Sequence, residues 1–205
     1  MILERLGFVR VVGMAEIPGR RARKKAATRQ ALADAALRLF LERGFDQVTV
    51  AEIAAAADTA VSTLFVHFPG GKEALVLGDG GERAEALTAA VRDRPAGGSV
   101  LDALRDFLAT RGPFAADLDP DHRRRTRLVV ETPALRAHAR KLWTDNEAVL
   151  ARVIAEETGG DPAELSLRLL ARFVLEVPDL AALEPDPRAA LRTAFAHLRA
   201  GWPDL

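Results

Sequence analysis

Cysteine is absent from this 205-residue chain, and so is tyrosine. Without cysteine the protein forms no disulfide bond and has no thiolate nucleophile or thiolate metal ligand. A chain without disulfides suits a reducing compartment, so we expect a cytoplasmic location.

Long apolar runs are also missing. No stretch of about 18 uninterrupted apolar residues occurs, so we expect no transmembrane helix and no membrane partner. Glu4, Arg5 and Arg10 interrupt the only segment resembling the apolar core of a signal peptide. We expect residues 1–19 to form a disordered tail. Because Met14 offers a second start, the sequence leaves open whether residues 1–13 belong to the native protein.

Recognisable catalytic motifs are lacking as well. The four histidines are scattered along the chain, and no His-Glu-x-x-His, glycine-rich phosphate loop or Gly-x-Ser-x-Gly occurs. We therefore predict that the protein is not an enzyme and that it holds no metal and no cofactor.

Net charge is zero, with 29 basic and 29 acidic side chains, which excludes a uniformly basic coat for nucleic acid. The charges are nevertheless unevenly placed. Residues 1–72 carry 11 basic and 7 acidic side chains, whereas residues 73–205 carry 18 and 22. Much of the basic excess lies in Arg20-Arg21-Ala22-Arg23-Lys24-Lys25. A basic front and an acidic back indicate two different tasks.

The chain reads as all-α. Alanine, leucine, arginine and glutamate dominate after Ala26, and apolar residues recur every three or four positions. We predict a first helix over residues 26–43 and a second over Val50–Ala57, opened by a capping box of Thr49 and Glu52. A left-handed turn at Asp58 and a third helix over Ala60–His67 complete a helix-turn-helix.

The segment Thr28–Leu75 resembles the DNA-binding domain of TetR-type transcriptional regulators. The matching residues are Leu39-Phe40 with Gly44, Thr49-Val50, Ile53-Ala54, Leu64-Phe65, His67-Phe68 and Lys72-Glu73-Ala74-Leu75. The chain departs from the family pattern in three ways: Asp58-Thr59-Ala60 replaces Gly-Val-Ser in the turn, Phe65 replaces tyrosine, and Pro69-Gly70-Gly71 is one residue longer than the usual link.

This resemblance implies a DNA-binding domain over residues 20–72 and a helical ligand-binding and dimerisation domain over residues 73–205. The third helix would enter the major groove, and the basic run would contact phosphates. The expected DNA contacts are Arg20, Arg21, Arg23, Lys24, Lys25, Thr49, Ala51, Val61, Ser62, Thr63, Phe65, His67 and Lys72. We expect Leu64 and Phe68 to face the core, and His67 is either a contact or a partly buried cap residue.

The back half should supply a pocket for a small-molecule effector. One predicted helix, residues 134–158, places His138, Trp143 and Asn146 on or near one side. The full set of pocket candidates is Phe107, Arg111, Phe114, Arg127, His138, Trp143, Asn146 and Phe173. For each aromatic residue in this set, an ordinary core position is the favoured alternative to the pocket.

The last two predicted helices, residues 162–182 and 186–200, carry apolar stripes, and Pro178 should kink or end the first of them. The stripes are Leu165, Leu169 and Phe173 on one helix and Leu191, Phe195 and Leu198 on the other. They suit a four-helix homodimer interface, which the resemblance implies, or a monomer core.

These observations predict a ligand-responsive repressor that binds a palindromic double-stranded DNA operator as a homodimer. The alternative is a helical protein-interaction module that has lost specific DNA binding. The sequence does not identify the operator, the regulated genes or the effector, and repression rather than activation is implied by the resemblance alone.

Overall fold

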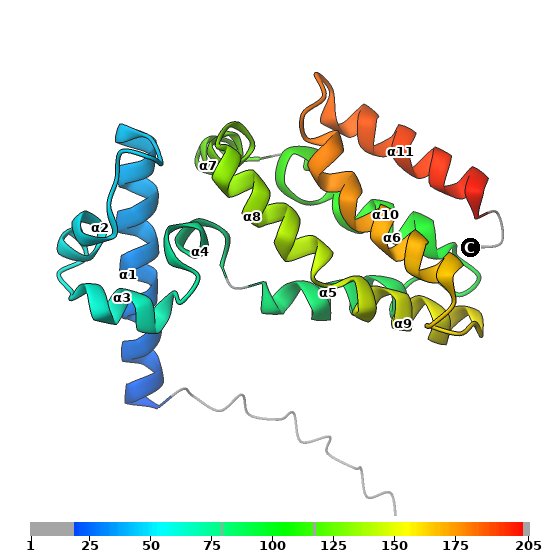
Figure 1. Ribbon diagram of the computed structural model, residues 1–205, viewed down its shortest axis with the longest axis horizontal. Helices are drawn as coiled ribbons and strands as arrows, with labels where there is room; N and C mark the ends of the chain where they lie inside the picture. Colours follow the sequence, from blue (N-terminus) through cyan, green and yellow to red (C-terminus); the bar gives the residue numbers. More distant parts are fainter. Residues whose placement is uncertain (1–18, 79, 117, 203–205) are drawn as a thin grey trace, which may run out of the picture.

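The structure, a computed structural model, describes residues 19–78, 80–116 and 118–202, and these contain helices but no strand. Apart from Gly19, the predicted tail lies outside the described residues. The helices form two groups that lie side by side, α1–α4 and α5–α11 (Figure 1). Their bounds are α1 Arg20–Arg43, α2 Val50–Ala56, α3 Val61–His67, α4 Gly71–Leu77, α5 Gly81–Arg92, α6 Val100–Ala109, the 3₁₀ turn η1 Gly112–Phe114, α7 Pro120–Glu131, α8 Pro133–Thr144, α9 Glu147–Thr158, α10 Leu165–Ala181 and α11 Pro187–Gly201.

Each group encloses its own hydrophobic core. The N-terminal cluster joins α1–α4 around Leu32, Phe40, Ile53 and Leu64, all of them buried. It also includes Ala74, Leu75 and Val76 of α4, which lie just beyond the predicted domain boundary between residues 72 and 73. That boundary stays a prediction. One buried residue of the second group, Leu135 on α8, belongs to this cluster and ties the two groups together.

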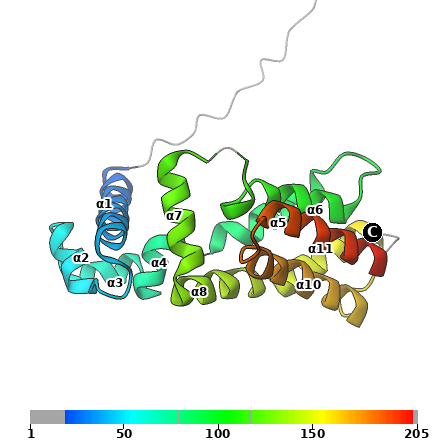
Figure 2. The same cartoon turned by 90° about the horizontal axis from the view of Figure 1, so that it is seen from above.

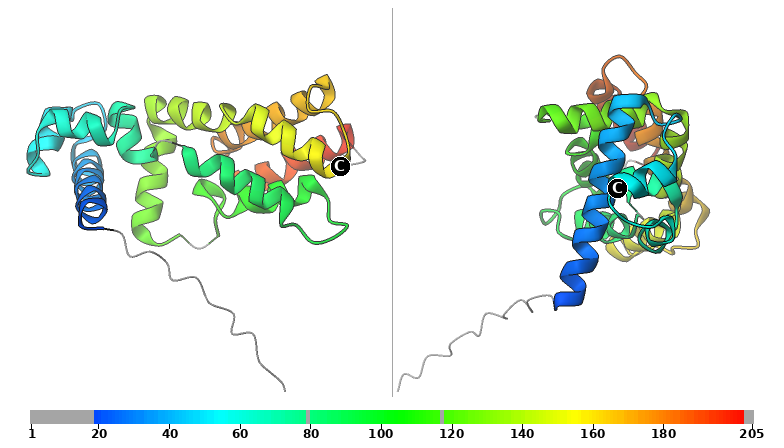
Figure 3. Two further views of the ribbon diagram at one scale, coloured as in Figure 1. Left: turned by 90° about the horizontal axis from the view of Figure 1, so that it is seen from below. Right: turned by 90° about the vertical axis from the view of Figure 1, so that its left-hand side faces the viewer.

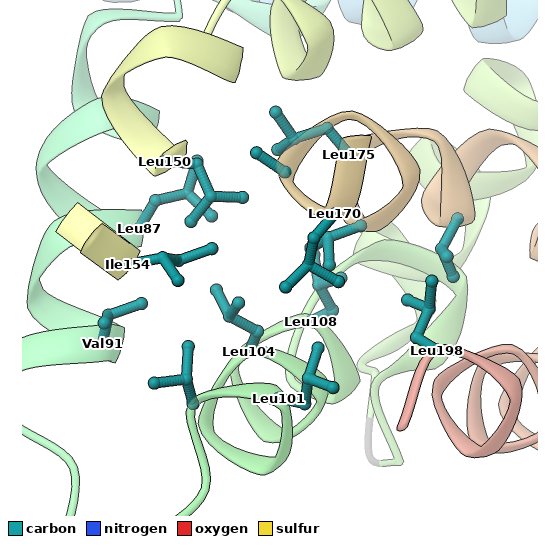
Figure 4. Packing of buried hydrophobic residues seen from close by; sticks show 14 of the residues in the cluster. Leu87, Val91, Leu101, Leu104, Leu108, Leu150, Ile154, Leu170, Leu175 and Leu198 are labelled. Carbon is teal, nitrogen blue, oxygen red and sulfur yellow. The ribbon is translucent and has the colours of Figure 1, made fainter. Parts of the chain in front are cut away.

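The C-terminal cluster is built mainly from leucines. Side chains from α5, α6, α9 and α10 point toward one another, among them Leu87, Leu104, Ile154 and Leu170, which are all fully buried (Figure 4). Leu198 of α11 closes the cluster on one side. Packing of these amphipathic faces, rather than intrinsic helix propensity, holds the bundle together.

Helix α7 differs in its setting from the other helices listed above, because none of its residues is buried. It stands between α1 and the rest of the C-terminal group (Figure 2). It packs against α8, α1 and η1. This helix therefore forms a wall rather than part of the core.

Helix α1 begins at Arg20, not at residue 26 as predicted. The basic run belongs to the helix, whose first turn is closed by the bond from Arg23 N to Gly19 O, 3.1 Å long. Arginine, lysine and alanine are strong helix formers, which explains the extension. The first turns project beyond the body of the N-terminal group (Figure 3).

The single helix predicted over residues 134–158 is wrong, because α8 and α9 are separated at Asp145 and Asn146. The Asn146 side chain is buried and donates through Nδ2 to Leu142 O at 2.8 Å. Asparagine and aspartate compete with the helical backbone for hydrogen bonds in this way, and so they favour helix ends.

Pro178 does not end α10, which continues to Ala181 with the proline inside it. Val177, Pro178 and Ala181 are buried, so packing offsets the lost backbone hydrogen bond. The proline also lies in the last turn, where few helical bonds follow.

Candidate functional site

The start of α2 is held by the predicted capping box. The Glu52 amide donates to Thr49 Oγ1 at 3.2 Å, and the Thr49 amide donates to Glu52 Oε2 at 2.8 Å. Arg43 of α1 adds an ion pair to Glu52 at 2.8 Å. The Thr49 hydrogen bonds, followed by that of Arg43, lower the pKa of Glu52 to about 2. The capping box is confirmed, and it ties α2 to α1.

The turn between α2 and α3 takes the conformation that the sequence predicts. Asp58 has a φ of 50°, in the left-handed region that aspartate tolerates. The Thr59 amide donates to Ala54 O at 2.9 Å, which closes the end of α2. The two helices are bent by 96° at this break, within the range of a helix-turn-helix.

Helix α3 buries one face and exposes the other. Leu64 is fully buried and Phe68 is 3% exposed, which confirms that these two residues face the core. Val61 and Phe65, two predicted DNA contacts, are 37% and 46% exposed, and Val66 beside them is 75% exposed. Ser62 is exposed and Thr63 is half-buried, while Thr49 and Ala51 are exposed at the start of α2.

His67 lies at the end of α3 and turns partly inward. Its carbonyl oxygen accepts a hydrogen bond of 2.5 Å from Arg29 Nη1 of α1. Its ring Nδ1 is buried and has no hydrogen-bond partner among the described residues. The Arg29 guanidinium stacks on Phe68 at 4.3 Å from the ring centroid. Of the two alternatives for His67, this geometry favours the partly buried cap residue.

Lys72 is placed inside the N-terminal group. Its Nζ donates to Phe45 O at 2.7 Å and lies 4.4 Å from the centroid of the Phe45 ring. The ammonium group therefore joins α4 to the loop between α1 and α2. Its predicted phosphate contact stays a prediction, but that contact would have to share the ammonium group with Phe45.

The basic run is the most exposed part of α1. Residues 20–27 are all exposed, and no acidic residue occurs in the first turn. Cations at a helix N-terminus oppose the helix dipole, so neighbouring anions would stabilise this end of α1. The predicted contacts in this run are Arg20, Arg21, Arg23, Lys24 and Lys25.

A cavity of about 540 Å³ lies in the second group, beside its junction with the first. Its walls come from α1, α4–α8, η1 and α10. Of the predicted pocket residues, Arg111, Phe114 and Trp143 line it. Arg83 lies over the Trp143 ring at 5.4 Å from the centroid.

Other predicted pocket residues lie elsewhere. Phe107 supports the cavity wall from behind, packing edge-on against Trp143 at 6.3 Å between centroids. Arg127 lines a second hollow, which shares Thr126 and Val130 of α7 with the first. The lining does not include His138, Asn146 or Phe173: Asn146 is bonded within its own turn, and Phe173 is 45% exposed and packs on Trp202.

Sequence reasoning missed five arginines that line the cavity. Arg136 and Arg140 share a helix face with Trp143, a spacing that could have indicated them. The other three come from separate helices, and no local pattern reveals them. The missed residues are Arg29, Arg83, Arg125, Arg136 and Arg140.

The two predicted dimer stripes have different surroundings. Leu165, Leu169 and Phe173 on α10 are 65%, 40% and 45% exposed. Leu191, Phe195 and Leu198 on α11 are buried in the C-terminal cluster of their own chain. The α11 stripe therefore serves the monomer core, the second of the two alternatives. Leu180, at 66% exposure, extends the α10 stripe.

The described residues contain no group of three or more His, Asp or Glu side chains able to hold a metal ion. No single described helix is long and apolar enough to span a membrane; α2 and α3 meet those criteria only as a bent pair, by length and composition.

The described chain thus combines a helix-turn-helix with a second helical group that contains a cavity. Comparison with known proteins agrees. Residues 32–78 match the family model described as bacterial regulatory proteins of the tetR family, and residues 98–203 match the MftR C-terminal domain. The chain therefore belongs to the TetR family of transcriptional regulators.

Two related sequences and one solved structure illustrate the relationship. The transcriptional regulator MftR of Mycobacterium tuberculosis, whose name refers to mycofactocin biosynthesis, is 29% identical over 76% of this chain and 78% of its own. The HTH-type transcriptional regulator TcmR of Streptomyces glaucescens is 37% identical over 70% and 66%. NalD of Pseudomonas aeruginosa, a secondary repressor of the MexAB-OprM efflux pump, shares the fold with a TM-score of 0.54, at 21% identity over 87% and 96% of the two chains.

Proposed function

We propose that this protein is a ligand-responsive repressor, not an enzyme, that binds a palindromic DNA operator as a cytoplasmic homodimer. One observation carries the proposal: the outer face of α3 is exposed, while the arginine that binds the end of α3, Arg29, also lines the cavity. Arg29 thus connects the helix proposed to read DNA with the cavity proposed to hold an effector.

The DNA contacts follow from exposure and chemistry. Val61, Ser62 and Phe65 are exposed on α3, where small and apolar side chains suit thymine methyl groups and a hydroxyl suits a phosphate or a base edge. Thr63 adds a second hydroxyl at the edge of this surface. The basic turns of α1 would supply contacts that do not depend on sequence. In a dimer, the two α3 helices would reach half-sites about 34–36 Å apart.

The α10 stripe is our proposed dimer interface. Its four members, Leu165, Leu169, Phe173 and Leu180, fall on one face of the helix, and each is at least 40% exposed. Burying such a stripe against its symmetry mate removes apolar surface from water in both chains.

An effector would act by preferring one conformation of the dimer. The cavity is large enough for a small organic molecule and is walled partly by aromatic and aliphatic side chains. Binding that favours a spacing unsuited to the operator would weaken repression, with a coupling of about 1–3 kcal/mol.

The first experiment selects genomic fragments bound by the purified protein and titrates the enriched site at several salt concentrations. We expect a palindromic site whose affinity falls steeply with salt. A Thr63→Ala plus Phe65→Ala variant should lose specific binding while keeping its helical circular dichroism. Arg152→Ala, on the exposed face of α9, is the matched control and should bind normally.

The dimer is tested separately by analytical ultracentrifugation. Leu169→Glu plus Phe173→Glu should give a folded monomer that binds the operator weakly, because the two half-sites are no longer linked. Arg192→Glu on the exposed face of α11 is the control and should stay dimeric. A dimer that persists in the α10 variant would place the interface elsewhere.

The interaction module remains the alternative, and one observation favours it. The outer face of α3 is largely apolar, with Val61, Phe65 and Val66 exposed together, which also suits a protein partner. If a folded protein enriches no DNA fragment even at low salt, this alternative replaces the repressor.

A further inference from the structure

Three arginines that line the cavity donate hydrogen bonds to backbone carbonyls at the ends of α3 and α4. Arg29 of α1 donates to His67 O at 2.5 Å, at the last residue of α3. Arg125 of α7 donates to Val76 O, and Arg83 of α5 donates to Leu77 O at 3.5 Å, both in the last turn of α4. The cavity wall is therefore bonded directly to the helix-turn-helix group.

These carbonyls need partners from outside their own helices. The last four carbonyl groups of a helix have no amide partner within it, and a nearby cation also suits the negative end of the helix dipole. Helices α3 and α4 have only seven residues each, so a large share of their carbonyls is of this kind. The arginines thus stabilise both helix ends.

The same cavity carries an excess of positive charge. Six arginines line it, against the carboxylates of Glu82 and Asp179. Arg136 and Arg140 on the α8 wall are paired with acidic residues of α10, Arg136 with Asp179 at 3.5 Å and Arg140 with Glu176 at 2.5 Å. The other four cavity arginines, Arg29, Arg83, Arg111 and Arg125, lie on the remaining walls.

Arg111 and Arg125 make no ion pair among the described residues. The Arg111 guanidinium lies flat on Phe107, 3.7 Å from the ring centroid, and donates to Phe107 O and Thr110 Oγ1. Burial lowers the pKa of Arg111, which shows that its charge is held partly away from water. A partly buried cation without a counter-ion favours an anion beside it.

We propose that the cavity binds an amphiphilic anion whose carboxylate or phosphate headgroup takes the Arg125 guanidinium away from Val76 O, with Arg111 as a second cation. The apolar part of the ligand lies against Phe114, Trp143 and Leu108, which line the same space. This inference rests on the proposed effector-controlled repressor and specifies its ligand class and its switch.

The physical reason is the difference between the two acceptors. A guanidinium binds an anionic oxygen more strongly than a neutral carbonyl, because the opposite charges attract and the anion can accept two parallel hydrogen bonds. Helix α7 has no fully buried residue; Leu128 and Val129 pack against the N-terminal cluster from its side, so a shift of Arg125 toward the ligand need not expose a core side chain. Loss of the hydrogen bond from Arg125 to Val76 O frees the end of α4. Because α3 and α4 share one hydrophobic core, α3 then moves with α4. By linkage, operator DNA would weaken ligand binding by the same factor.

The test reads ligand binding without DNA, from the fluorescence of Trp143 in a Trp202→Phe background that leaves Trp143 as the single tryptophan. The probes are decanoate, decyl phosphate, decanol and decyltrimethylammonium, all below their micelle concentrations. We expect saturable binding of one or both anions, about tenfold or more tighter than decanol, and no binding of the cation. Comparing the affinities of decanoate and decyl phosphate shows whether the site prefers a carboxylate or a phosphate headgroup.

Variants then test the switch. Arg125→Gln should weaken the favoured anion about tenfold. Because the variant lacks the bond to Val76 O, it should also bind the operator more weakly than the parent without ligand, and the anion should release no further DNA. Arg124→Gln is the matched control, since Arg124 is one residue away, 66% exposed and paired with Asp121. If Arg125→Gln fails to fold, Arg111→Gln provides the same ligand-binding test.

The outcomes separate this inference from the proposed function. Equal binding of decanol and the anions, or unchanged anion binding in Arg125→Gln, overturns the inference but leaves the repressor intact. If the operator is bound and no probe binds, both the inference and the effector role are overturned. If an anion binds through Arg125 but no DNA fragment is enriched, the ligand class stands, and the switch fails together with the repressor.

Discussion

The two groups of helices are stabilised in different ways. In the N-terminal group, α2, α3 and α4 have seven residues each, and the core contains three phenylalanines, of which Phe40 and Phe45 lie 4.9 Å apart between ring centroids. In the C-terminal group, α10 has 17 residues and α11 has 15, and they pack on leucines beside a cavity of about 540 Å³.

This difference fits the tasks that we propose. Helices of seven residues are not stable alone in water, so caps and long-range bonds must hold them in one arrangement. Such a unit suits reading a fixed DNA surface. The second group leaves α7 without a buried residue beside a hollow, and this suits a unit that changes shape around a ligand.

Leu135 connects the two groups, and its truncation should have the largest effect on stability. It is fully buried and lies on α8 but packs in the N-terminal cluster. Leu135→Ala should lower the free energy of unfolding by about 2–5 kcal/mol, measured by urea denaturation. Hydrogen exchange should increase in both α8 and α1–α4.

Leu170→Ala is the matched control for this comparison, because Leu170 is equally buried but lies only in the C-terminal cluster. Its loss should accelerate exchange in α5–α11 more than in α1–α4. Identical hydrogen-exchange patterns in the two variants would mean that the two groups of helices unfold as one unit and are not stabilised separately.

Lys72 and Lys24 distinguish a structural cation from a DNA-binding one. Lys72→Gln removes a charged hydrogen bond to Phe45 O and should cost about 1–3 kcal/mol of stability. Lys24→Gln, in the exposed turns of α1, should leave stability unchanged and reduce the salt slope of DNA binding by about 1. If the Lys72 variant instead has normal stability and a reduced salt slope, the result would support the predicted phosphate contact of Lys72.

The smallest effect concerns Glu52 and acid. Its pKa is lowered in the folded state from 4.5 to about 2, so its contribution to stability is present above pH 4.5 and is lost as the pH falls toward 2. Glu52→Gln should flatten the acid side of the stability curve, followed by urea denaturation between pH 5 and the lowest pH at which the protein stays folded. Glu42→Gln on α1, outside the capping box, should keep the acid dependence of the parent.

Local signals predicted the helix-turn-helix closely. Thr49 and Glu52 form the capping box, Asp58 takes the left-handed turn, and Leu64 and Phe68 are buried. Each of these depends on residues within a few positions of one another. The break between α8 and α9 was missed, although the hydrogen bond of Asn146 that accompanies it is also local. Packing decided between the two alternatives for the stripe of α11.

The sequence by itself determined the all-α class, the family and the ends of the short helices, because periodicity, caps and turns act over a few residues. Only the tertiary structure decided which apolar stripe is core and which is surface, and which arginines meet at the cavity. Arg29, Arg83 and Arg125 come from α1, α5 and α7. Their convergence depends on how three separate helices pack, and spacing along the chain does not encode it.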